Sequence, residues 1–325
     1  MDLSTTYLGM RLPHPLIVGA GPLGDDLDSV KALEDAGAAM VVLRSLYEEE
    51  ITGEQMDEFV NVEQHSESFS EAETFAPDPI LALGPEEYLE HLRMVKSAVG
   101  IPVVASLNGV TPGGWVCYAE LLEQAGADGL ELHIYHAASD MTWSAAEVER
   151  RAIEIVREVK RKLHIPVAVK LAPLHTAFAH FARQLDGVGA DGLVLFTRFH
   201  RVDIDVDELE VIRTLPLSDS AELMPRLRGA AALAGRVNAS IAITGGIHTA
   251  LDVIKATMAG AHATQMVSAL LRHGPAHLTR VRKDVELWME EHEWGSLNEM
   301  RGNMSLQRIP DPAAYERANF RMSLR

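Results

Sequence analysis

One pattern recurs along the chain: a Gly-Ala step closes a helical stretch and a short apolar run follows it. It occurs at residues 36–45, 125–134, 188–197 and 259–268. Similar apolar runs follow Pro or Ala at residues 14–22, 100–109, 164–173 and 239–247. Their apolar residues show little alternation, which is typical of strands that are buried on both faces. The repeat therefore predicts eight parallel strands.

Amphipathic helical patterns separate these runs, as in "DDLDSVKALEDAG" and "SAAEVERRAIEIVREVKRKL". Eight alternations of strand and helix predict an α/β fold of the TIM (β/α)8 barrel type. The 325 residues are 47% hydrophobic, which is ample for one core. Because no linker-like stretch divides the chain, we expect residues 1–325 to form a single barrel domain.

The stretch "LIVGAGPLG" at residues 16–24 matches the glycine spacing G-x-G-x-x-G of dinucleotide-binding turns. In that fold the turn would begin a helix beneath a pyrophosphate. The eightfold repeat favours another interpretation, in which these glycines end the first barrel strand.

Residues 47–80 form a long acidic insertion after the second predicted strand. A loop of this length after a barrel strand is more often a lid, a binding loop or an interface arm than a filler. A solvated, partly disordered insertion is the alternative.

Charge and cysteine content limit the class of partner. The chain has 29 basic and 47 acidic residues, a net charge of −18, and no basic stripe. We therefore expect a small-molecule substrate and no nucleic acid or membrane as partner. A lone cysteine, Cys117, and an N-terminus without signal-peptide features predict a cytoplasmic protein.

In a barrel the catalytic residues follow the carboxyl ends of the strands. Lys170, in "VAVKLAP", ends a buried run, so it needs an anionic partner or the open end of the barrel. A structural ion pair is the plainer explanation for Lys170, and an internal strut is the plainer one for Arg44.

The last two strand ends carry residues suited to an anion. Gly245 and Gly246 follow the seventh strand, and Val267 and Ser268 precede a helix. Barrels commonly bind phosphate there through backbone N–H groups, although a Gly-Gly pair also serves ordinary turns. A flavin or a phosphorylated sugar would use this site together with Lys170, and the strand ends do not separate the two.

The order of these segments resembles the dihydroorotate dehydrogenase family of FMN enzymes over roughly residues 3–305. The segments that carry the resemblance are "LGMRLPHPLIVGAGPLG", "GADGLELHI", "IPVAVKLAP", "LRGAAAL", "IAITGGIHTALDVIKATMAGA", "TQMVSALLRHGP" and "GSLNEMRGNM".

The resemblance implies an FMN site. Lys170 would lie near N1 and O2 of the flavin, where the reduced ring carries negative charge. Gly245, Gly246, Val267 and Ser268 would hold the phosphate. The other residues implied in cofactor binding are Ala20, Gly21, Arg44, Ser45, Asn108, Thr197 and Gly229.

The departures from the family fall on the substrate side. His133 replaces the first asparagine of the family's segment after the fourth strand, and His136 stands where the cytosolic class has its cysteine base. A histidine at that position is suited to general acid–base catalysis near neutral pH. The alternative is that both histidines fill space over the flavin or pair with the acidic loop. A metal site with His133, His136, His175 and His200 is disfavoured, because no carboxylate accompanies them.

We therefore expect an FMN-dependent oxidoreductase acting on a substrate other than dihydroorotate, with His136, Lys170 and His133 as catalytic residues. The resemblance also implies a homodimer. An iron–sulfur relay would need a redox partner protein, because the chain has no CxxC cluster.

Two alternatives stay open. One is a phosphate-binding lyase or aldolase without flavin, in which Lys170 is a Schiff-base or electrostatic residue. The other is a non-catalytic barrel subunit or scaffold with the 47–80 loop as its contact arm.

Overall fold

A computed structural model describes residues 1–51, 84–110, 115–135, 140–198, 203–212 and 216–323. Eight parallel strands close into a barrel in the order β11-β12-β3-β4-β5-β6-β7-β8, and β8 pairs with β11 to close it. The barrel strands are β3 (Leu16–Val18), β4 (Val41–Tyr47), β5 (Val103–Asn108), β6 (Gly129–His133), β7 (Val167–Leu171), β8 (Gly192–Leu195), β11 (Ser240–Thr244) and β12 (Ala263–Met266). The predicted TIM barrel is confirmed, with one strand in each of the eight predicted runs.

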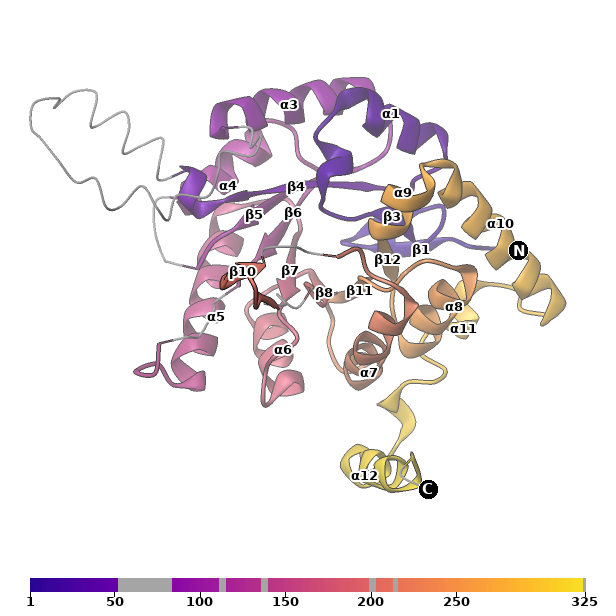
Figure 1. The fold of residues 1–325 in the computed structure, drawn as a ribbon. Helices are drawn as coiled ribbons and strands as arrows, with labels where there is room; N and C mark the ends of the chain where they lie inside the picture. The colour runs from indigo at the N-terminus through magenta and orange to yellow at the C-terminus, as the bar shows by residue number, and fades with distance from the viewer. Residues whose placement is uncertain (52–83, 111–114, 136–139, 199–202, 213–215, 324–325) are drawn as a thin grey trace, which may run out of the picture.

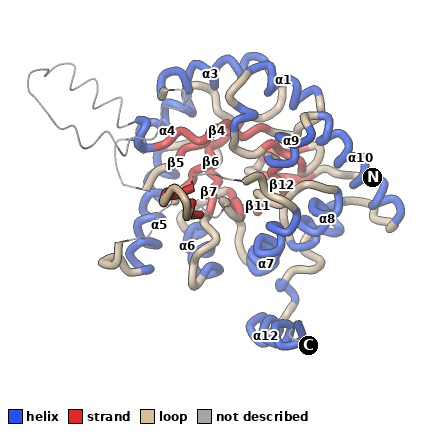
Figure 2. Tube along the Cα trace, in the orientation of Figure 1, coloured by secondary structure: helices blue, strands red, loops and turns tan. Residues whose placement is uncertain are grey.

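Helices surround the barrel, with the strands at the centre (Figures 1 and 2). They are α1 (Leu27–Asp35), α3 (Pro85–Ala98), α4 (Trp115–Gln124), α5 (Ala145–Lys162), α6 (Phe178–Gly187), α7 (Leu223–Leu233), α8 (Ala250–Ala259), α9 (Ser268–His273), α10 (Ala276–Glu291) and α11 (Leu297–Met300). A last helix, α12 (Pro312–Ser323), lies apart from the barrel in Figure 1.

The sequence of α5 shows why these helices form where they do. Ser144 caps its start by accepting a hydrogen bond from the N–H of Glu147, and basic residues occupy its last turn. Ile155, Val156 and Val159 form the buried face against the barrel. Both ends therefore suit the helix dipole, and one apolar face suits packing on the strands.

A hairpin closes the end of the barrel at which the strands begin. β1 (Thr5–Tyr7) and β2 (Met10–Leu12) pair antiparallel, and Tyr7, Leu8 and Leu12 pack with side chains of the barrel interior. A second small hairpin joins β9 (Asp203–Asp205) and β10 (Glu210–Ile212). The repeat does not predict either hairpin, because each strand has only three residues.

β4 runs on to Tyr47, so the second strand extends into the region predicted as insertion. Residues 52–80 of the predicted insertion lie outside the described residues. None of the helices in the described part of the chain is long and apolar enough to cross a membrane.

A cavity at the carboxyl end of the barrel

A cavity of about 380 Å³ opens at the carboxyl ends of the barrel strands. This volume falls within the range of small-molecule sites, roughly 300–1,000 Å³. Most of the predicted site residues line it: Ala20, Gly21, Arg44, Ser45, His133, Lys170, Thr197, Gly245, Gly246, Val267 and Ser268. Residues from both ends of the sequence therefore meet in one cavity.

Of the predicted site residues that the structure describes, two do not line this cavity. A third predicted residue, His136, lies outside the described residues. Asn108 is buried behind His133, and Gly229 lies within α7, where an added Cβ would come 2.9 Å from Cζ of Phe196. Gly229 thus allows α7 to pack closely on the residue that follows β8.

Lys170 has the anionic partner that its burial requires. Its Nζ lies 3.0 Å from Oε1 of Glu131, on the neighbouring strand β6. The other carboxylate oxygen of Glu131 accepts a hydrogen bond from Nε2 of Gln265, on β12. Lys170 therefore both forms a buried ion pair and contributes to the cavity wall.

Asn108 fixes the orientation of the His133 ring through a hydrogen bond. The Asn108 amide nitrogen lies 3.0 Å from Nδ1 of His133, so Nδ1 accepts and Nε2 carries the proton. Burial, together with the charge of Lys170, lowers the pKa of His133 to about 3. His133 is therefore a neutral hydrogen-bond donor at neutral pH.

Arg44 is anchored by two carboxylates. Its Nε lies 3.2 Å from Oδ1 of Asp25, and its Nη1 lies 3.7 Å from Oε1 of Glu50. The strut interpretation of Arg44 thus has support, but its third nitrogen, Nη2, is buried without a hydrogen-bond partner among the described residues.

Four cavity residues hold such buried polar atoms. Arg44 Nη2, His133 Nε2, Arg198 Nε and Gln265 Oε1 have no hydrogen-bond partner within the described part of the chain. Buried polar groups are almost always satisfied in native proteins. Unsatisfied polar atoms on residues that line the cavity favour a ligand that offers both donors and acceptors.

Two glycines after β11, Gly245 and Gly246, form part of the cavity wall. Gly245 and Gly246 have φ angles of +81° and +79°. A Cβ on Gly246 would approach the backbone nitrogen of Leu223 to 2.5 Å, and one on Gly245 would lie 2.8 Å from Nη2 of Arg226. Only glycine fits this turn, which brings the chain close to the cavity.

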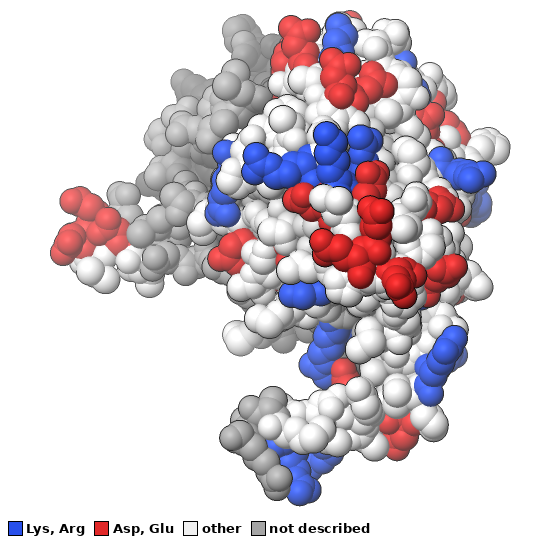
Figure 3. Space-filling model, turned by 90° about the vertical axis from the view of Figure 1, so that its right-hand side faces the viewer, with Lys and Arg blue, Asp and Glu red and all other residues white. Residues whose placement is uncertain are grey.

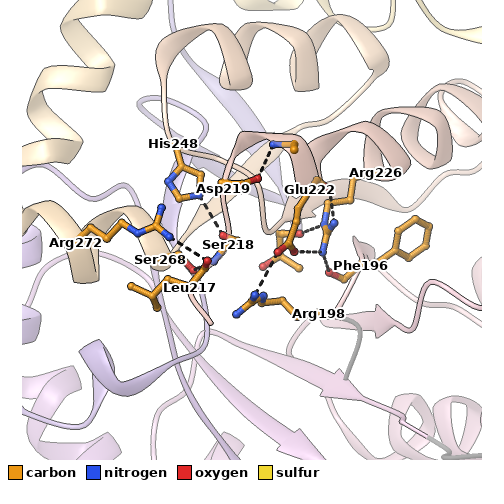
Figure 4. Close-up of polar contacts among 12 residues, drawn as sticks. Phe196, Arg198, Leu217, Ser218, Asp219, Glu222, Arg226, His248, Ser268 and Arg272 are labelled. Carbon is orange, nitrogen blue, oxygen red and sulfur yellow. Dashed lines mark hydrogen bonds and ion pairs between the residues drawn. The ribbon is translucent and has the colours of Figure 1, made fainter. Parts of the chain in front are cut away.

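Leu217 and Ser218, which the sequence does not indicate as site residues, also line the cavity near this turn. The N–H of Ser218 donates to Oγ of Ser268 at 3.1 Å, and Oγ of Ser218 lies 3.1 Å from Nε2 of His248. Arg272 donates to the carbonyl oxygen of Leu217 at 3.0 Å (Figure 4). Nothing in the local sequence around Ser218 indicates this placement.

Arg226 ties the neighbouring loops together. Its guanidinium donates to three backbone carbonyl oxygens (Figure 4). They belong to Thr244 at the end of β11, to Phe196 directly after β8, and to Glu222 directly before α7. Glu222 also pairs with Arg198 at 3.2 Å. These contacts hold the Gly245-Gly246 turn in position from α7.

Two further residues were missed, although a signal for them exists. Glu131 and Gln265 are polar residues inside apolar strands, both about 1% exposed. A buried polar residue in a strand indicates a partner nearby. As for metals, no group of three or more His, Cys, Asp or Glu side chains gathers among the described residues.

Comparisons with known proteins agree with this architecture. The profile of the dihydroorotate dehydrogenase family matches residues 2–289. The catalytic subunit of an NAD-dependent dihydroorotate dehydrogenase B from Thermoplasma acidophilum is 26% identical over 309 residues, covering 93% of this chain and 98% of the relative.

Two other relatives are named for different activities. A putative fumarate-type dihydroorotate dehydrogenase A from Aeropyrum pernix is 27% identical, and the match covers 89% of this chain and 94% of that relative. The chloroplastic NADP-dependent dihydropyrimidine dehydrogenase of Arabidopsis thaliana is 21% identical, and the match covers 94% of this chain and 77% of that relative. The similarity thus extends across more than one substrate.

Proposed function

Because the chain belongs to the dihydroorotate dehydrogenase family, we propose that it is an FMN-dependent oxidoreductase acting on a CH–CH bond of a small substrate other than dihydroorotate. The observation that carries this proposal is the cavity, which is lined both by Lys170 and by the Gly245-Gly246 turn. Its buried, unsatisfied donors and acceptor fit a cofactor that offers both acceptors and donors.

FMN, when bound, supplies a ring that accepts or returns two electrons. On the protein side, Lys170 and His133 place donors along one wall, and the small residues Ala20 and Gly21 leave room for a flat ring. The backbone of Gly245 and Gly246 and the start of α9 would hold the phosphate. His136 is the proposed acid or base.

The substrate proposal rests on the residues that differ from the family pattern. His133 and His136 stand where the family has an asparagine and a cysteine. A neutral histidine that donates through Nε2 selects a substrate with a hydrogen-bond acceptor, such as a carbonyl oxygen. We also propose a partner protein as electron acceptor, since several relatives are described as catalytic subunits.

The lyase alternative has less support. A Schiff-base lysine must lose its proton before it attacks a carbonyl. Nζ of Lys170 is instead engaged by the carboxylate of Glu131, at 3.0 Å. We therefore retain the flavin proposal and not the Schiff-base one.

Purification tests the proposal directly. We expect a yellow protein that releases FMN on denaturation, and a colourless protein that cannot be reconstituted with FMN would refute the proposal. With FMN bound, anaerobic bleaching by candidate reductants separates an enzyme from a scaffold. His136→Ala should then slow substrate-dependent flavin reduction, and an unchanged rate would remove His136 from the mechanism.

A further inference from the structure

A second cavity, of about 300 Å³, lies outside the wall of the barrel, and we call it the outer cavity. It is lined by residues of β7, α5 and α6 and by the segments that follow β6 and β7; α5 and α6 lie side by side in Figure 1. Successive side chains of a strand face opposite ways, so Lys170 lines the first cavity whereas Val169 and Leu171 line the outer one. No described residue lines both cavities, so the outer cavity is a separate site.

The wall of the outer cavity is mainly apolar. Much of it is formed by Tyr135, Trp143, Val148, Leu171, Leu174 and Phe181. The volume of the cavity lies at the lower end of the range of small-molecule sites, roughly 300–1,000 Å³. A ligand of this cavity is therefore small and carries an apolar or aromatic group.

Glu149 places a carboxylate in this apolar wall. Acidic and basic side chains are interspersed on the surface of the molecule, as Figure 3 shows for one face, but Glu149 lines the outer cavity and its side chain is 18% exposed. Nδ1 of His175 lies 4.0 Å from Oε1 of Glu149, beyond hydrogen-bonding distance. Burial lowers the pKa of His175, so this ring is neutral at pH 7. Within the described part of the chain, the Glu149 carboxylate therefore has neither a hydrogen bond nor a charged partner.

Arg151 supplies the opposite charge. Its Cζ lies 4.1 Å from the centre of the Trp143 ring, and both residues line the outer cavity. Stacking on an aromatic ring uses the flat face of the guanidinium and leaves the N–H groups at its edge available to an acceptor. No described carboxylate pairs with Arg151. The outer cavity thus presents one carboxylate and one guanidinium, each able to bind a group of opposite charge.

A ligand with a single charge would leave one of these two groups unpaired and be repelled by it, whereas a zwitterion pairs with both. We propose that the outer cavity binds an α-amino acid with an apolar side chain. The ammonium group of the ligand binds Glu149, its carboxylate binds Arg151, and its side chain packs on the wall around Phe181. The inference is independent of the proposed function, because the outer cavity contains none of the residues proposed to bind FMN.

Titration calorimetry of the full chain with L-phenylalanine and with L-leucine tests the proposal. We expect saturable binding with one site per chain, and a saturating concentration of FMN should not displace the amino acid. Glu149→Gln and Arg151→Gln should each raise the dissociation constant at least tenfold. Arg150→Gln and Glu154→Gln are the matched controls, because these two residues form an exposed ion pair on the same helix outside the cavity, and each should leave the dissociation constant unchanged.

Two analogues of phenylalanine test the charge pairing in the native chain. Phenethylamine, which lacks the carboxylate, should bind more weakly than L-phenylalanine, and its binding should depend on Glu149 but not on Arg151. 3-Phenylpropionate, which lacks the ammonium group, should show the reverse dependence. The proposal would be overturned by the absence of saturable binding of both amino acids, by binding that survives either substitution unchanged, or by an analogue that binds as tightly as L-phenylalanine.

Discussion

Lys170 and Glu131 form a buried ion pair across neighbouring strands, with Nζ 3.0 Å from Oε1. Lys170 is 8% exposed and Glu131 1%. Breaking such a pair by removing one partner leaves an uncompensated buried charge, whereas removing both does not. Stability and cofactor chemistry should therefore respond differently to substitutions here.

Lys170→Met should destabilise the fold by about 3–5 kcal/mol, because Glu131 is left without its cation. Lys170→Met combined with Glu131→Gln should recover most of that loss. Both variants should lower the reduction potential of bound FMN, because a cation that stabilises the reduced ring is gone. Chemical denaturation measures the stability, and a dye-coupled titration measures the potential.

Glu131→Gln alone is the matched variant, since it keeps the ammonium group and removes its counter-charge. The reduction potential should then rise, by about 30 mV for each tenfold change in the two-electron equilibrium. A potential that stays at the native value in all three variants would show that Lys170 does not act on the flavin.

Gly246→Ala should weaken the binding of FMN and leave the binding of riboflavin nearly unchanged. Gly246 has a φ of +79°, and an added Cβ would come 2.5 Å from the nitrogen of Leu223, so the turn must shift. We expect at least a tenfold rise in the dissociation constant for FMN, measured by fluorescence quenching.

Gly274→Ala is the control for backbone strain. Gly274 has a φ of +75°, but a Cβ there meets nothing within 4 Å. Both variants place an alanine at a positive φ, which costs conformational free energy in each case. If Gly274→Ala weakens FMN binding as much as Gly246→Ala does, the Gly245-Gly246 turn is not a phosphate site.

The barrel strands were predictable because the Gly-Ala repeat and the apolar runs are local features. Hairpins such as Thr5–Tyr7 with Met10–Leu12 were not, because three-residue strands have no periodicity and their burial depends on the closed barrel. Among the cavity residues, Lys170 and the Gly245-Gly246 turn were predictable because they stand at the carboxyl ends of predicted strands. Ser218 could not be found, since its place depends on side chains from Ser268 and His248, distant in the sequence.

The free energy of unfolding should fall as the pH drops from about 6.5 toward 4. Burial, with a contribution from Arg282, lowers the pKa of His14 to about 4. The unfolded chain takes up a proton near pH 6.5, while the folded chain resists it until about pH 4. The stability is therefore fully present above pH 6.5 and is lost below it.

His14→Gln should make that decline shallower by about 1.4 kcal/mol per pH unit near pH 5. His262 and His133, whose pKa values burial also lowers, keep the rest of the slope. Urea unfolding at a series of pH values measures the slope for the native protein and for His14→Gln, and equal slopes in the two proteins would contradict the assignment.

His133 should stay neutral from pH 5 to pH 8, with its proton on Nε2. The amide of Asn108 donates to Nδ1 at 3.0 Å, and burial beside Lys170 lowers the pKa of the ring to about 3. Nitrogen-15 NMR of labelled histidine, assigned with His133→Gln, reports both the charge and the tautomer. Asn108→Asp should move the proton to Nδ1, because a carboxylate accepts instead of donating. A ring that titrates near 6.5 in the native protein would make His133 available as a general base, whereas a neutral Nε2–H ring limits it to donating a hydrogen bond to the substrate.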